Sequence, residues 1–290
     1  MESFAGKLAV VTGGGSGIGR ELVRQLAAAG CSVATCDLNA DTLEETAVLA
    51  RDGSPDDTRV TGHVWDVADE AQVERFRDEL LTAHTASHVD LVFANAAIGA
   101  GGSFLNDPRD AWERVFAVNW GGVYNCARVF LPLLVKSSEG VLVNTSSVNG
   151  FWASLGPGVP HTAYSTAKFA VKGFTEGLIE DLRTNAPHVK VVLVMPGHVA
   201  TNIVGNSMRA FGITDPEQLE AANAGFRKDA PMTATEAATV ILDAVRSSTW
   251  RVIVGDGARK LDEFVRANPE DAYDYTLLRQ YREPPRVAGV

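Results

Sequence analysis

The sequence predicts an α/β fold in which helices cover both faces of a parallel sheet, and two observations support this prediction. First, seven short runs rich in β-branched residues are almost continuously apolar, as strands buried on both faces are. Second, longer helical patterns separate these runs, and strands that alternate regularly with helices form crossover units and a parallel sheet. With 290 residues, 46% of them hydrophobic, the chain suits one large domain spanning residues 1–290.

The expected elements follow one another without internal repeats or low-complexity linkers. The β-branched runs predict the strands KLAVVT, SVATCD, RVTGHVWD, DLVFAN, GVLVNTSS, VKVVLVMPG and WRVIVG. Helical patterns between these runs predict helices near 17–29, 40–51, 69–85, 110–136, 161–186 and 233–247.

Three segments depart from this alternation. Residues 150–162 contain several Gly and Pro residues, which predict a loop. Residues 198–232 contain scattered apolar residues, which predict short helices that act as a substrate lid, with a packing element or disorder as alternatives. Residues 256–290 form a C-terminal extension, which is expected to be either a trailing tail or an oligomer contact.

Composition limits the class of protein. The net charge of −10 disfavours nucleic acid or an anionic membrane as a partner, because both require a basic surface. The start lacks a signal-type pattern and no apolar run approaches membrane-spanning length, so we expect a soluble cytoplasmic protein. Cys31, Cys36 and Cys126 lack zinc-type spacing and are expected to be buried, reduced thiols. No cluster of residues suggests a metal.

A glycine-rich segment, TGGGSGIG at residues 12–19, directly follows the first expected strand and precedes a helix. Glycines at such a turn let backbone amides approach a pyrophosphate at the positive end of the helix. Gly13, Gly17 and Gly19 are the candidates for this role. Tight turns also need glycine for ordinary conformational reasons, so the motif acquires meaning from its flanking strand and helix.

The second expected strand ends in Asp37, eighteen residues after Gly19. A carboxylate at this position accepts hydrogen bonds from the adenosine ribose hydroxyls and repels the 2′-phosphate of NADP. Neither Ser16 nor Leu38 supplies a compensating cation, so the sequence predicts NAD as the cofactor, with NADP less favoured. The alternative is that Asp37 caps a helix or lies in a loop.

Two further strand ends complete the expected nucleotide site. Asp66 follows the third strand, where it either meets the adenine edge or caps the helix that begins near Asp69. The fourth strand ends in ANAAI, whose small residues leave room for a nucleotide.

The segment YSTAK places Tyr164 and Lys168 four residues apart, and therefore on one face of a helix. A nearby cation favours the phenolate form of a tyrosine, which otherwise titrates near pH 10. The simpler alternative is that Tyr164 packs in the core and Lys168 is solvated.

These motifs resemble, in their order, the short-chain dehydrogenase/reductase family in its compact single-domain form, over about residues 6–255. The matching segments are TGGGSGIG, Asp37, Asp66, NAA at 95–97, Asn119 in VNWGG, NTSSVNG, YSTAK and PGHVAT at 196–201. The resemblance implies a Rossmann-type doubly wound sheet of about seven strands. It also implies an NAD-dependent oxidoreductase that interconverts an alcohol and a carbonyl compound.

Four residues are the catalytic candidates. Tyr164 is expected to act as general acid/base. Lys168 is expected to favour the phenolate together with the positive nicotinamide ring and, by resemblance, to bind the nicotinamide ribose. Ser147 ends the fifth strand and is expected to stabilise charge on the substrate oxygen, unless it only forms a turn. Asn119, a poor helix residue, holds a water of a proton relay by resemblance, and is otherwise a local kink or cap.

The cofactor is expected to contact residues from all of these motifs. Val199 and Thr201 match positions that contact the nicotinamide carboxamide, although the segment could be an ordinary loop after a strand. The expected cofactor-binding residues are Gly13, Ser16, Gly17, Ile18, Gly19, Asp37, Leu38, Asp66, Val67, Asn95, Ala96, Tyr164, Lys168, Pro196, Gly197, Val199 and Thr201.

The chain departs from the family pattern at two places. Ala94 to Ala97 read ANAA where members often read Asn-Asn-Ala-Gly, a mild change at a spacing site. The interval from Ser147 to Tyr164 is several residues longer than is common, which affects the expected substrate pocket rather than the chemistry.

The expected substrate is a small apolar secondary alcohol or its ketone, because the candidate pocket walls are apolar, unless these residues are simply core. The candidate walls are Phe151, Trp152, Leu155, Ile203, Val204, Met208 and Phe211. The resemblance implies a homotetramer or dimer formed through 110–136 and 161–186. Rival functions are a catalytically idle NAD-binding regulator, a scaffold protein without cofactor, and an epimerase or dehydratase.

Overall fold

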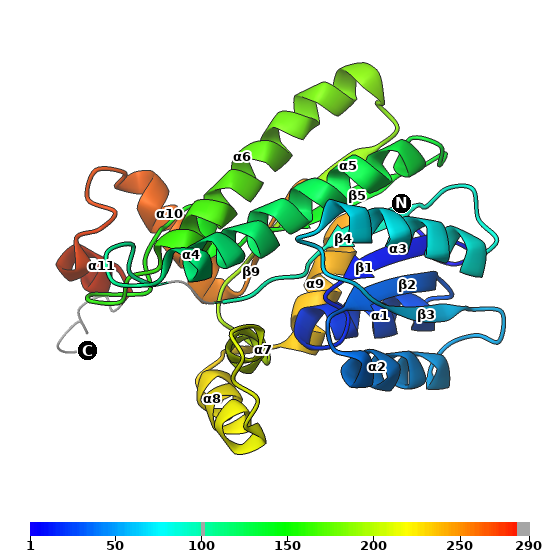
Figure 1. The fold of residues 1–290 in the computed structure, drawn as a ribbon. Helices are drawn as coiled ribbons and strands as arrows, with labels where there is room; N and C mark the ends of the chain where they lie inside the picture. Colours follow the sequence, from blue (N-terminus) through cyan, green and yellow to red (C-terminus); the bar gives the residue numbers. More distant parts are fainter. Residues whose placement is uncertain (100–101, 283–290) are drawn as a thin grey trace, which may run out of the picture.

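The computed structural model describes residues 1–99 and 102–282, and a parallel sheet lies at its centre (Figure 1). The strand order is β3-β2-β1-β4-β5-β6-β9, and every neighbouring pair is parallel. The strands are β1 (Leu8–Thr12), β2 (Ser32–Asp37), β3 (Val60–Val64), β4 (Leu91–Ala94), β5 (Val141–Thr145), β6 (Lys190–Pro196) and β9 (Arg251–Val254). The predicted seven-stranded doubly wound sheet is therefore confirmed.

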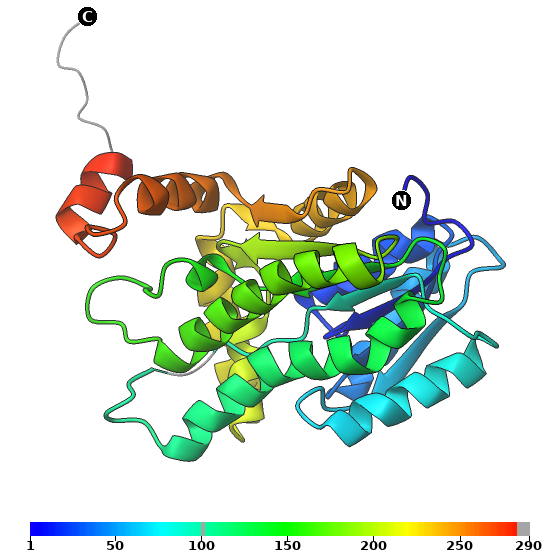
Figure 2. The ribbon, with the colours of Figure 1, turned by 90° about the horizontal axis from the view of Figure 1, so that it is seen from above.

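Helices cover both faces of the sheet (Figures 1 and 2). One face carries α1 (Gly17–Ala28), α2 (Ala40–Asp52) and α9 (Ala234–Arg246). The other carries α3 (Glu70–Ala83), α4 (Arg109–Phe116), α5 (Gly122–Leu134) and α6 (Thr162–Asn185). Most of the predicted helices have these bounds within two residues. The helix expected over 110–136 is instead divided, because a π-helical turn, η1 (Ala117–Gly121), separates α4 from α5.

The alternation of side chains along each strand produces two separate cores. Val10 and Val92 pack beneath α3, α5 and α6, whereas Val11 and Phe93 pack beneath α1 and α9. All of these side chains are buried, which explains why the strand sequences are apolar at successive positions rather than at alternate ones. The three cysteines are buried and free, and they belong to the same two cores.

The chain order of the strands reverses between β1 and β4, which creates a topological switch point. In open parallel sheets, ligands bind in the crevice outside the carboxyl ends of the strands at such a point. The glycine-rich segment follows β1, and Asn95 follows β4, so the topology places both at this crevice.

The segment 198–232 lies outside the main sheet and contains the short helices that were expected. It folds as β7 (Val199–Ala200), α7 (Ile203–Ala210), α8 (Pro216–Lys228) and β8 (Met232–Thr233). The two short strands pair in parallel at the base of the segment, a pairing too brief to leave a pattern in the sequence. In Figure 1, α7 and α8 project from the crevice side of the molecule.

The described part of the C-terminal extension packs against its own chain instead of trailing as a tail. It forms α10 (Asp256–Ala267) and α11 (Tyr275–Arg282), which lie near the loop after β5 (Figures 1 and 2). That loop begins with a single 3₁₀ turn, η2 (Val148–Gly150), and has no further helix before α6. The stretch 283–290, part of the expected extension, lies outside the described residues.

Candidate active site

A cavity of about 1230 Å³ opens at the carboxyl ends of the strands. Its lining includes every residue expected to bind the cofactor, from Gly13 in the first loop to Thr201 after β7. Ser147, Tyr164 and Lys168 line the same cavity. Asn119 does not line it and is fully buried behind it. The structure thus brings residues from six separate loops together in one site.

The glycine-rich loop is packed too closely for side chains. Gly13 has a φ of +71°, and a Cβ added there would lie 2.8 Å from Cα of Ala96. A Cβ at Gly19 would lie 2.0 Å from the carbonyl oxygen of Gly13. Gly17 has a φ of +54° and abuts Thr201. The loop therefore presents backbone at the start of α1, as a cradle for the pyrophosphate of a dinucleotide requires.

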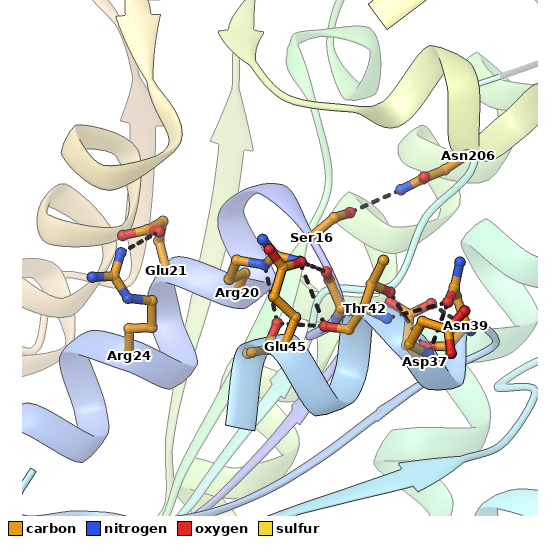
Figure 3. A network of polar contacts seen from close by, with 12 residues as sticks. Ser16, Arg20, Glu21, Arg24, Asp37, Asn39, Thr42, Glu45 and Asn206 are labelled. Atoms are coloured by element: carbon orange, nitrogen blue, oxygen red, sulfur yellow. Dashed lines mark hydrogen bonds and ion pairs between the residues drawn. The ribbon is translucent and has the colours of Figure 1, made fainter. Parts of the chain in front are cut away.

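Asp37 is held in place by backbone amides at the end of β2. Its Oδ2 accepts from the N–H of Gly15 at 3.0 Å, and its Oδ1 accepts from Leu38 at 2.8 Å and from Asn39 at 3.3 Å (Figure 3). The N-cap of α2 is Asn39, whose side chain accepts from Asp41 and Thr42. The alternative in which Asp37 caps the helix is therefore wrong.

Asp66 likewise lines the cavity without capping a helix. Its Oδ2 lies 2.8 Å from Nη2 of Arg114, and its Oδ1 accepts from the N–H of Ala68 at 2.9 Å. The N-cap of α3 is Asp69, which accepts from Ala71 and Gln72. The alternative in which Asp66 caps this helix is therefore wrong, and the ion pair with α4 could not be seen from local spacing.

The segment after β4 is fixed to the end of β1. Oγ1 of Thr12 accepts from the N–H of Asn95 at 3.0 Å and from that of Ala96 at 3.1 Å. The side-chain amide of Asn95 donates to the carbonyl oxygen of Thr12 at 3.2 Å. These bonds hold the two sides of the switch point together, and Thr12 is a supporting residue that the motif did not single out.

Ser147, Tyr164 and Lys168 form the polar end of the cavity. Tyr164 lies in the first turn of α6, and Lys168 follows one turn later with Nζ 5.4 Å from the Tyr164 ring centroid. Nζ of Lys168 donates to the carbonyl oxygen of Thr145 at 3.0 Å. Ser147 lies two residues beyond the end of β5, as the N-cap of η2, and its hydroxyl accepts from the N–H of Asn149 at 3.1 Å. Ser146 also lines the cavity, and its hydroxyl donates to the carbonyl oxygen of Lys168 at 2.7 Å.

Burial controls the ionisation of this pair. Desolvation raises the pKa of Tyr164 to about 12, and a hydrogen bond with Ser147 opposes that rise. Desolvation also lowers the pKa of Lys168 to about 7. The expectation that Lys168 and the positive nicotinamide ring together favour the phenolate stays a prediction, and the lowered pKa of Lys168 means that the lysine supplies only part of the charge near pH 7.

Asn119 lies at the π-helical turn between α4 and α5. Its side-chain amide donates to the carbonyl oxygens of Ile98 and Val115, both at 2.9 Å. Its Oδ1 is buried and has no hydrogen-bond partner among the described residues. A π turn leaves helix carbonyls free and often occurs at functional sites. An ordered water could donate a hydrogen bond to this buried Oδ1.

The apolar end of the cavity matches the sequence expectation only in part. Of the expected walls, Trp152, Leu155, Ile203 and Val204 line the cavity. Phe151, Met208 and Phe211 do not. Phe151 lies beneath the guanidinium of Arg251. Met208 is partly buried on α7 away from the cavity lining, and Phe211 is the C-cap of α7, where its side chain is exposed.

The C-terminal extension supplies walls that the sequence reasoning missed. We define the C-terminal wall as the four cavity-lining residues Ala258, Leu261, Tyr275 and Leu278. Apolar residues of α10 at helical spacing, at 258, 261, 264 and 265, were the available signal for a packed helix. No spacing rule could show that this helix returns to the cavity.

Two histidines also line the cavity. The ring of His161 lies 4.6 Å from that of Tyr164, between centroids. Nε2 of His198 lies 2.7 Å from the carbonyl oxygen of Phe226, so His198 anchors α8. Within residues 1–99 and 102–282, no group of three or more His, Cys, Asp or Glu is arranged to hold a metal ion. Over the same ranges, no helix is long and apolar enough to cross a membrane.

Comparison with known proteins gives a consistent result. Residues 7–210 match the family model described as short chain dehydrogenase. The chain is 35% identical to the putative oxidoreductase SadH of Mycobacterium tuberculosis over 266 residues, 92% of each chain. A short chain dehydrogenase/reductase from Burkholderia phymatum in complex with NAD superposes with a TM-score of 0.80 at 29% identity, over 100% of both chains. Levodione reductase gives 0.71 at 28% identity, over 88% of this chain and 98% of its own.

Proposed function

Because the chain belongs to the short-chain dehydrogenase/reductase family of oxidoreductases, we propose that it interconverts an apolar secondary alcohol and its ketone with NAD as cofactor. One observation carries the proposal: Ser147, Tyr164 and Lys168 converge in the same cavity as the glycine-rich loop and Asp37. The closely packed glycines and the acceptor-only carboxylate fit a dinucleotide with free ribose hydroxyls.

In the proposed reaction, the alcohol carbon transfers a hydride to the nicotinamide ring that NAD supplies, and the hydroxyl proton passes to Tyr164. Ser147 donates a hydrogen bond to the substrate oxygen as negative charge develops there. Since burial holds the pKa of Tyr164 near 12, the phenolate requires additional positive charge at the site. Lys168, with its Nζ fixed by the Thr145 carbonyl, provides part of this charge in its protonated fraction, and the positive nicotinamide ring would supply the rest.

We further propose that Asn119 acts through Lys168 rather than on the substrate. Its unpartnered Oδ1 and its location behind the cavity support a water-mediated proton path from Lys168 toward solvent. The free Oδ1 favours this role over that of a simple kink, because a kink requires no acceptor there.

The substrate class follows from the apolar end of the cavity. This end is lined mostly by hydrocarbon, from Trp152, Leu155, Ile203 and the C-terminal wall. Besides Arg114, two arginines line the cavity, Arg209 and Arg279, and both are solvent-exposed. An apolar lining with a few convergent polar groups is typical of sites for small apolar ligands. We propose that the segment 198–232 is the lid over this end, within one domain that spans residues 1–290.

We also propose an oligomeric assembly and a cellular location for the protein. The aromatic side chains of Trp120 on η1, Tyr124 on α5 and Phe174 on α6 contact one another, and Tyr124 is more than a third exposed. This partly exposed aromatic cluster supports a homotetramer or dimer formed through α5 and α6. The acidic chain with free cysteines fits a cytoplasmic protein.

The test follows NADH formation with NAD and a panel of cyclic, benzylic and linear secondary alcohols at mildly alkaline pH. We expect turnover by the wild-type protein, and a loss of about 10²–10⁴-fold in Tyr164→Phe, which lacks the exchangeable proton. Lys172→Ala is a matched control, since Lys172 pairs with Glu176 and does not line the cavity. Tight NAD binding without turnover across the panel would instead favour the idle NAD-binding regulator.

A further inference from the structure

One arginine side chain ties the glycine-rich loop to α2. Nη2 of Arg20 donates to the carbonyl oxygen of Gly15 at 2.7 Å and lies 2.5 Å from Oε2 of Glu45. Nε of Arg20 donates to Oγ1 of Thr46 at 3.0 Å. Glu45 and Thr46 belong to α2, whereas Arg20 is in the first part of α1 (Figure 3). The loop is therefore fixed against α2 rather than free to move on its own.

The residue that Arg20 holds is also the residue that orients Asp37. The N–H of Gly15 donates to Oδ2 of Asp37, and a Cβ added at Gly15 would lie 2.9 Å from Cγ of Asp37. The same Cβ would lie 2.6 Å from Oγ1 of Thr42. No side chain fits between the backbone of Gly15 and the side chain of Asp37. The position of the Gly15 backbone therefore determines where the carboxylate of Asp37 lies.

Arg20 does this without presenting a cation to the cavity. It is not among the residues that line the cavity, and its guanidinium is paired with the carboxylate of Glu45. A free arginine near the adenosine ribose would attract a 2′-phosphate, since guanidinium binds phosphate in a bidentate manner. The ion pair with Glu45 removes that attraction and leaves the carboxylate of Asp37 as the charge that faces the ribose.

We propose that Arg20 is a positioning residue that holds Gly15 against Asp37 and thereby maintains the preference for NAD over NADP. The inference rests on the proposed function, in which Asp37 accepts hydrogen bonds from the ribose. Arg20 acts through Gly15 and Asp37 and does not touch the cofactor. Removal of the Arg20 side chain frees the loop, so the carboxylate of Asp37 loses its fixed orientation. The attraction of this carboxylate for ribose hydroxyls and its repulsion of a 2′-phosphate both weaken as a result.

The test measures the dissociation constants of NADH and NADPH by nicotinamide fluorescence, so no substrate is needed. In Arg20→Ala we expect NADH to bind about tenfold more weakly and NADPH to change by less than about threefold. The loop loses its anchors to Arg20, and the resulting displacement of Asp37 weakens about one charge-assisted hydrogen bond between its carboxylate and the ribose. Arg20→Lys still carries a donor for the Gly15 carbonyl, and we expect it to keep NADH affinity within about threefold of wild type.

Arg24→Ala is the matched control. Arg24 lies one turn further along α1 and pairs with Glu21 at 2.9 Å, as Arg20 pairs with Glu45 (Figure 3). Unlike Arg20, it forms no hydrogen bond to the glycine-rich loop within the described residues. Both dissociation constants should equal those of the wild type. Circular dichroism establishes whether each variant is folded. If Arg20→Ala is not folded, Arg20→Gln replaces it, because glutamine is uncharged but retains N–H donors.

Two outcomes would overturn the inference. One is an Arg20→Ala protein whose NADH dissociation constant lies within about twofold of wild type. The other is an equal weakening of NADH and NADPH, which indicates general damage to the loop. A wild-type protein that prefers NADPH, or binds neither nucleotide, contradicts the proposed function instead, so the two failures are distinguishable.

Discussion

Lys168 carries its amino group into an almost completely buried site, and this burial costs the folded state free energy. Its pKa falls to about 7 on folding, from 10.5. Between these two pH values the unfolded chain binds more protons than the folded chain, so the free energy of unfolding rises with pH. Below pH 7 the buried amine is protonated in the folded protein as well as in the unfolded chain. The rise in the free energy of unfolding that Lys168 contributes is therefore absent there.

The corresponding prediction concerns Lys168→Met. Between pH 7 and pH 9, Lys168 should contribute a rise of about 2 kcal/mol in the free energy of unfolding of the wild type. The variant lacks this group, so its rise should be smaller by that amount. Urea denaturation of both proteins at the two pH values measures the difference, because all other titrating groups cancel. Equal rises would show that Lys168 is not desolvated in the folded protein.

The residues of the site were predictable where a motif has fixed local spacing, as in the glycine-rich loop or in Tyr164 and Lys168 on one helix face. Properties that depend on tertiary burial were not. The pKa of Tyr164 is raised because the surrounding fold desolvates it, which neighbouring residues in the sequence do not reveal. The ion pair between Asp66 and Arg114 joins elements 48 positions apart and leaves no sequence pattern.

Among the elements, α10 and α11 are attached to the loop after β5 by a cluster centred on Trp152. Its indole N–H donates to the carbonyl oxygen of Ala272 at 2.7 Å, and its ring is stacked on Tyr273 with centroids 6.4 Å apart. The hydroxyls of Ser154 and Tyr275 lie 2.8 Å apart. These contacts fix the C-terminal wall relative to Tyr164, the proposed general acid/base.

Enlarging the cavity at this wall should change substrate size preference. In Leu278→Ala we expect the ratio of kcat/KM for 1-(2-naphthyl)ethanol to that for 1-phenylethanol to rise by about tenfold, since a larger ring can use the space. Leu277→Ala is the control, because Leu277 packs in the same cluster but does not line the cavity. The ratio is independent of the fraction of folded enzyme. An unchanged ratio in Leu278→Ala would exclude this wall from substrate contact.

Element boundaries could be predicted from periodicity because most helices here carry one apolar face toward the sheet. The exception, the division between α4 and α5, depends on a π turn at residues 117–121. The φ values at its two ends, −61° at Ala117 and −56° at Gly121, are helical, so a continuous helix is the natural prediction from the sequence. The packing of the extension on its own chain was not predictable for a different reason: its partners are more than 100 residues distant.

For the whole molecule, the cavity draws on loops from both halves of the sheet, so a bound cofactor links the two halves. At about one hundred times its dissociation constant, NADH should stabilise the fold by about 2.7 kcal/mol and raise Tm by about 5 °C in a single transition. Differential scanning calorimetry measures this shift.

Gly19→Ala should abolish that shift, because the added methyl group meets the Gly13 carbonyl at 2.0 Å and displaces the loop. Gly53→Ala is the control, since a Cβ at Gly53 meets nothing within 4 Å. If Gly19→Ala retained the full increase in Tm, the glycine-rich loop would not be part of the cofactor site.

The position of the Trp152 cluster has a consequence for how the protein is made. Synthesis proceeds from the N-terminus, and folding begins while the chain is still growing. The glycine-rich loop, Asp37, Ser147 and Tyr164 all emerge from the ribosome before α10 and α11. The residues proposed to hold the dinucleotide are therefore synthesised first, and the wall proposed to contact the substrate is complete only when the last segments emerge.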